Sequence, residues 1–80
     1  MKFEFKETKV TRHMRHRMPD GVTNVRAYKV RLKPGPGYDG GVIGTVIGSD
    51  MGSKPGWATW RDGMYSGGSP TRQAAAEKLV

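Results

Sequence analysis

The first 33 residues contain two stretches in which polar and apolar side chains alternate with the period of two that a half-buried β-strand shows. In residues 2–10, Phe3 and Phe5 occupy apolar positions and are expected to point inward. Residues 22–33 repeat the pattern more regularly. Their apolar positions are Tyr28, Val30 and Leu32, and their polar positions are Lys29, Arg31 and Lys33. One face of this second strand is therefore expected to pack in a core, and the other to carry three positive charges.

The segment between these two strands is rich in arginine and histidine. Residues 11–18 are expected either to continue the first strand or to form a basic loop. The following Pro19-Asp20-Gly21 favours a turn, because proline fixes φ and glycine tolerates the left-handed region. The first 33 residues are thus expected to hold two strands and a basic connection.

A third apolar stretch, Val42–Ser49, is rich in β-branched residues and predicts a further strand. It follows a loop of glycine and proline at residues 34–41. Gly44 and Gly48 within the strand suggest bulges or close packing by a neighbour. This strand could be an exposed edge that pairs with a second copy of the chain, which leaves a homodimer open.

The strongest hairpin signal is Asp62-Gly63, a dipeptide that suits a two-residue type I′ turn. The register of such a turn places Arg61 opposite Met64. It also places Trp60 opposite Tyr65, an aromatic cross-strand pair that stabilises a hairpin. Trp60 is therefore expected in the core.

The sequence predicts one helix, at the end of the chain. Ser69 is the expected N-cap and Pro70 the first helical residue. The apolar edge of this helix consists of Ala75, Ala76, Leu79 and Val80. A helix of three turns is marginal alone, so it must dock on the apolar face of the sheet. The expected fold class is α+β: a small twisted, mainly antiparallel sheet of four to five strands with one C-terminal helix packed on one face.

Composition narrows the class of protein further. With 80 residues, 12 of them glycine, the chain is expected to form a single small domain rich in turns. It has no cysteine, which excludes a disulfide scaffold, a thiolate zinc site and a cysteine nucleophile. The expected location is the reducing cytoplasm, associated with the nucleoid or inside an infected host cell. No apolar run approaches the ~18 residues of a membrane span, and no signal peptide is recognisable, so no membrane partner is expected.

Charge is the main functional clue. The chain carries a formal net charge of +7, and all of the excess lies in residues 1–33. Residues 34–80 are neutral and hold all but one of the glycines. The domain is thus expected to have a basic, strand-rich part (1–33) and a neutral, glycine-rich hairpin-plus-helix part (34–80). A basic surface favours an anionic partner.

Other kinds of site are disfavoured. Residues 35–40 match the glycine pattern of a dinucleotide-binding loop, but no helix follows to meet a pyrophosphate. His13 and His16 have a spacing that metal sites use, yet the flanking arginines would repel a cation. The serines and aspartates lie mostly beside glycines, where turns explain them. A non-enzymatic module without metal or cofactor is expected.

The basic residues form the leading candidate site. Arginine supplies forked donors for phosphate oxygens, and lysines at strand spacing lie on one face. The expected nucleic-acid-binding residues are Arg12, Arg15, Arg17, Arg26, Lys29, Arg31, Lys33 and Arg61. Trp57 and Tyr38 are candidates for stacking on bases or for anchoring a protein interface. The alternative without a binding role is a solvated edge strand whose charges only prevent aggregation.

The C-terminal third carries a family resemblance. Residues 57–63 (Trp-Ala-Thr-Trp-Arg-Asp-Gly) and 69–79, which open with Ser-Pro-Thr, form a ββα pattern. This pattern resembles the small N-terminal DNA-binding domains of tyrosine-recombinase integrases, although Gly67-Gly68 stands where that family often has an aromatic residue. The resemblance implies a three-stranded sheet whose open face enters the major groove of DNA. It would place Lys29, Arg31 and Arg61 on or near that face.

Two functions are therefore expected from different classes. The leading one is binding of nucleic acid, duplex DNA in preference to RNA, through backbone phosphates. RNA ranks lower because the tail is only faintly similar to the end of a double-stranded-RNA-binding domain, whose opening helix is missing. The alternative is a small protein-interaction module, similar in type to phage-encoded basic proteins, that binds a host protein with an acidic surface.

Overall fold

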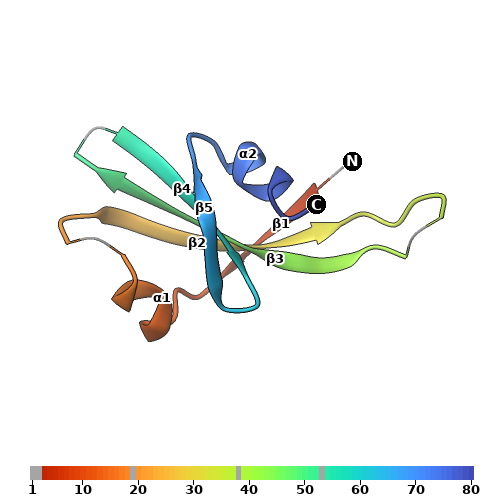
Figure 1. The fold of residues 1–80 in the computed structure, drawn as a ribbon, viewed down its shortest axis with the longest axis horizontal. Coiled ribbons are helices and arrows are strands. Elements are labelled where there is room, and N and C mark those ends of the chain that lie inside the picture. The colour runs from red at the N-terminus through yellow and green to blue at the C-terminus, as the bar shows by residue number, and fades with distance from the viewer. Residues whose placement is uncertain (1–2, 19, 38, 53) are drawn as a thin grey trace.

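The computed structural model describes residues 3–18, 20–37, 39–52 and 54–80. Its helices and strands are, in chain order, β1 (Phe3–Thr8), α1 (Arg12–His16), β2 (Thr23–Leu32), β3 (Gly41–Met51), β4 (Lys54–Arg61), β5 (Met64–Ser69) and α2 (Arg72–Glu77). The strands form one sheet in the order β1-β2-β3-β4-β5, and every neighbouring pair is antiparallel. This confirms the predicted α+β fold with a C-terminal helix (Figure 1).

The order of strands corrects the expectation for residues 42–49. They belong to β3, which lies at the centre of the sheet between β2 and β4. Residues 45–51 of β3 pair with β4, and much of the strand also pairs with β2, whereas residues 41–44 have no partner on the β4 side. The outermost strands of the sheet are β1 and β5. Pairing with a second copy along residues 45–49 is therefore blocked by β4, and only residues 42–44 keep the open edge that the sequence suggested.

The hairpin between β4 and β5 has the predicted register. Arg61 pairs with Met64 and Trp60 with Tyr65, and the two rings meet edge-on with centroids 6.2 Å apart. Asp62 and Gly63 both have positive φ, 52° and 76°, as a type I′ turn requires. Trp60 is buried, as expected.

One face of the sheet packs against α2. The buried residues of this cluster are Val30, Val46, Ala75, Ala76 and Leu79. Phe3 and Phe5 pack against them, which confirms that both point inward. The Thr59 hydroxyl donates a buried 2.7 Å hydrogen bond to the Ala75 carbonyl. Carbonyls near the end of a helix lack helical partners, so this bond joins α2 to β4 and satisfies one of them.

The other face packs against α1. Ala27, Ile47 and Trp60 are buried there, with Met14 and Met18 against them. The two helices thus lie on opposite sides of the sheet (Figure 1). Within the described ranges, neither helix is long and apolar enough to cross a membrane.

The helix α1 corrects the expectation of a strand or a loop over residues 11–18. Thr11 caps it, accepting a hydrogen bond from the Met14 amide at 3.2 Å. A helix of five residues is not stable alone. It forms here because Met14 and Met18 dock on the sheet, a long-range contact that no local pattern reveals.

The start of α2 also differs from the prediction. Its N-cap is Thr71, whose hydroxyl accepts a hydrogen bond from the Ala74 amide at 3.1 Å. Ser69, the expected cap, is the last residue of β5 and pairs with Trp57. The apolar edge is buried as predicted except at Val80, which lies beyond α2 and is 60% exposed.

Candidate nucleic-acid interface

The helix α1 presents three arginines to solvent. Its inward side is set by Met14, which packs on the sheet. Arg12 and Arg15 lie in the helix and Arg17 is its C-cap; all three are exposed. Thr11 caps α1 at its start and Met14 packs on the sheet, so the backbone that carries these arginines is anchored on this side of the sheet.

The sheet adds cations on the same side. Lys29 and Arg31 alternate with buried Val30, so they share the face of Ala27, on which α1 packs. Lys6 of β1 pairs directly with Lys29 of β2. Like charges opposite one another on neighbouring strands destabilise a sheet, so this pair is an unfavourable feature for folding alone. It borders a hollow of about 280 Å³ whose lining includes Lys6, Lys29 and Arg31.

We call this surface the basic face and define it by Lys6, Arg12, Arg15, Arg17, Lys29 and Arg31. Two acids adjoin it: Glu4 pairs with Arg31 in the register of β1 and β2, and Glu7 lines the hollow together with Lys6 and Lys29. Among the described residues, the one ion pair is between Arg26 and Asp50, and it involves none of the six cations of the basic face. The six cations of the basic face are therefore available to an external anion.

Arg26 lies apart from the basic face and is occupied within the protein. Its guanidinium is 3.6 Å from the Asp50 carboxylate and donates a 2.8 Å hydrogen bond to the Asn24 carbonyl. It also lies 4.8 Å from the centre of the Trp57 ring. Asn24 sits in a bulge of β2 with φ of 53°, and its amide donates to Asp50 as well. These contacts give Arg26 a role in holding β2 to β3 and β4.

The remaining sequence-predicted residues are dispersed. Arg61 is exposed but alternates with Trp60, so it shares the face of α2. Lys33 is exposed just beyond the end of β2. Trp57 is half-buried, with its ring 6.0 Å from that of Tyr28. Tyr38 falls outside the described residues. The structure thus places Lys29 and Arg31 on the same side of the sheet as α1, which carries Arg12, Arg15 and Arg17. Arg26 and Arg61 lie on the other side.

Two basic residues were not singled out from the sequence. Lys6 joins the basic face; its alternation with Phe5 gave its side, but only the register showed it opposite Lys29. Arg72, the first residue of α2, lies over Phe5 at 4.1 Å and Tyr28 at 5.1 Å. Such stacking of a guanidinium on rings stabilises by ~0.5–1 kcal/mol or more. Arg72 thus serves to hold α2 against β1 and β2.

The histidines belong to the same helix as the arginines. His13 packs edge-on against Trp60, with ring centroids 6.3 Å apart. Among the described residues, no group of three or more His, Cys, Asp or Glu side chains could hold a metal ion. This side of the molecule therefore presents a cationic surface that packs on the aromatic ring of Trp60.

Comparison with protein-family models, with curated proteins and with solved structures gives no match. The function has to be inferred from the site. The resemblance to integrase DNA-binding domains stays a prediction from the residues that suggest it. What the geometry adds is that α1 covers part of the sheet face opposite α2, while the part around Lys29 and Arg31 stays open.

Proposed function

We propose that this protein is a non-enzymatic module that binds duplex DNA through its backbone phosphates, with the basic face as the contact surface. One observation supports this most: three arginines of α1 and three cations of the sheet gather on one side without an acidic partner bound to them in the described ranges. Arginine and lysine contacts to phosphates release condensed counterions, which drives binding without base specificity.

The unfavourable pairing of Lys6 with Lys29 supports the same function. A strand pair selected only for stability would place opposite charges across this position. A phosphate lying between the two ammonium groups would neutralise both and remove the repulsion. The cost to folding is then offset in the complex.

A protein partner with an acidic surface is the second candidate, and a specific observation favours it. Met64 and Tyr65 of β5 are 71% and 57% exposed, at an edge of the sheet. Exposed apolar and aromatic side chains are typical anchors of protein interfaces. Capture of partners from a lysate with and without nuclease separates the two functions: nuclease treatment is expected to remove the partners of a DNA-binding protein and to spare an acidic protein.

The dependence of duplex affinity on salt tests the leading proposal. Contacts to about five phosphates predict a slope near −4.5 for log affinity against log salt between about 50 and 300 mM. Anisotropy of a fluorescent duplex measures it. Lys29→Ala is expected to reduce the slope by about 1, whereas Arg61→Ala, on the other side of the sheet, is expected to leave it unchanged.

A charge-reversal variant is a stronger test of the same proposal. Replacing Arg12, Arg15 and Arg17 with glutamate should abolish duplex binding, because it reverses the charge of the whole α1 surface. Absence of binding by the natural protein at about 50 mM salt, or a slope near zero, would contradict the proposal.

A further inference from the structure

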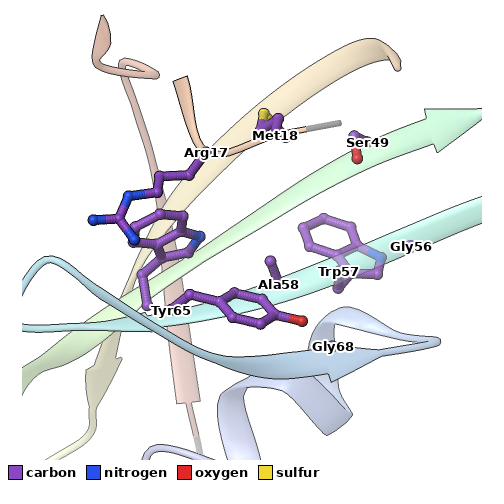
Figure 2. A pocket seen from close by; sticks show the side chains of 9 residues that line it. Arg17, Met18, Ser49, Gly56, Trp57, Ala58, Tyr65 and Gly68 are labelled. Carbon is purple, nitrogen blue, oxygen red and sulfur yellow. The ribbon is translucent and has the colours of Figure 1, made fainter. Parts of the chain in front are cut away.

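A second hollow lies on the α1 side of the sheet, next to the basic face (Figure 2). It has a volume of about 340 Å³ and lies between the end of α1 and the hairpin of β4 and β5. Its lining residues are Arg17, Met18, Ser49, Gly56, Trp57, Ala58, Trp60, Tyr65 and Gly68. This volume is at the lower end of the ~300–1,000 Å³ that small-molecule sites occupy.

The hollow exists because small residues lie between large ones. Gly56, Ala58 and Gly68 supply little side-chain volume to its base, while Met18 and Tyr65 border it. Figure 2 shows Tyr65 reaching along β5 toward Gly68, with its hydroxyl at the far end. Tyr65 is 57% exposed although its ring meets Trp60, so part of its surface remains free for a ligand.

The charges around the hollow indicate which ligand suits it. Arg17 is the charged side chain among its described lining residues, and none of that lining is acidic. Arg12 and Arg15 precede it on α1 and are exposed. A ligand that fits must combine a flat apolar group, for the hollow, with negative charge, for the arginines. A nucleotide strand has both, since bases stack on aromatic side chains while phosphates contact arginine.

We propose that this hollow takes one unpaired nucleobase, stacked on Tyr65, from a nucleic acid whose phosphates lie on the basic face. The inference rests on the proposed function and narrows it: the preferred substrate is DNA that carries a bulged or otherwise unpaired base. A fully paired duplex would contact the basic face and leave the hollow unused.

Three duplexes of the same length test this proposal by fluorescence anisotropy: one fully paired, one with a single bulged nucleotide, and one with a bulged abasic nucleotide. The bulged duplex is expected to bind at least about fivefold more tightly than the other two, because only it offers a base to stack. A bulged 2-aminopurine should change its fluorescence on binding.

Variants of β5 assign the effect to Tyr65. Tyr65→Ala should remove the preference and leave affinity for the paired duplex unchanged, whereas Tyr65→Phe, which keeps the ring, should retain it. Met64→Ala, at the neighbouring exposed position, is the matched control and should behave as the natural protein.

Equal affinity for all three duplexes would overturn the inference while the proposed function stands. No binding to any duplex would overturn both, and a preference that survives Tyr65→Ala would overturn the assignment to this hollow.

Discussion

At the scale of single residues, the smallest side chains decide how closely the elements approach. A Cβ built on Gly44 would lie 2.5 Å from a Leu79 methyl and 2.8 Å from the Trp60 carbonyl oxygen. One on Gly48 would lie 2.7 Å from the Trp57 ring. Both glycines lie in the central strand β3. The Leu79 side chain and the Trp57 indole therefore pack directly against the backbone of this strand. The sequence suggested bulges or close packing at both positions, and the structure shows close packing and identifies the partners.

Gly44→Ala is therefore expected to destabilise the protein by about 1–3 kcal/mol, because a methyl group inserted there forces a shift of Leu79 and of the backbone at Trp60. Urea unfolding measures the change. Gly56→Ala is the control, since a Cβ there meets no atom within 4 Å. Equal stability of the two variants would contradict the packing at Gly44.

Contacts of single side chains also decide which candidate basic residues already have a partner within the protein. Alternation along β2 predicted the side of Lys29 and Arg31, and the structure agrees. The occupation of Arg26 could not be predicted, because its partners Asp50 and Trp57 are more than 20 residues away in the chain. Such contacts depend on strand register and not on local pattern.

At the scale of elements, α1 is the feature on which the candidate site depends most. It carries half of the basic face, yet it has five residues and a single side-chain cap. Its stability must come from Met14 and Met18 packing on Ala27, Ile47 and Trp60. The position of its arginines is thus coupled to the packing of apolar side chains beneath them.

Met14→Ser is expected to weaken duplex binding severalfold without changing any charge, because it removes apolar area that holds α1 on the sheet. Anisotropy at fixed salt measures the affinity. Met51→Ser is the matched control, since Met51 is 53% exposed in β3. If Met14→Ser and Met51→Ser bind duplex equally, docking of α1 does not position the arginines.

At the scale of the whole molecule, electrostatics oppose folding. The net charge is +7, and Lys6 faces Lys29 across β1 and β2. The fold is also extended, measuring 43 × 23 × 19 Å, with the β2–β3 hairpin projecting at one end (Figure 1). Gathering cations on one side of an elongated sheet increases the repulsion between them.

Salt is therefore expected to stabilise the protein. Raising sodium chloride from about 20 to 300 mM should increase the free energy of unfolding in urea, because it screens repulsion between exposed charges. Lys6→Glu should raise stability at low salt by about 0.2–1 kcal/mol more than Lys54→Glu does, because only the former creates an opposite-charge pair with Lys29. A stability that falls with salt would show that favourable ion pairs dominate instead.

The sequence by itself determined the features that depend on neighbours in the chain. Alternation set the faces of β1 and β2, the Asp62-Gly63 dipeptide set the β4–β5 register, and alanines with Leu79 set the buried edge of α2. These signals are local, because backbone preference and side-chain period act over a few residues.

Only the tertiary structure decided the order of the strands, the formation of α1 and the partners of Arg26 and Trp57. Each of these depends on contacts between residues far apart in the chain. The free energy of such contacts cannot be inferred from any short segment of the sequence. The same is true of the candidate site: its cations were visible in the sequence, but their gathering on one side, beside a hollow at Tyr65, results from the packing of α1 against the sheet.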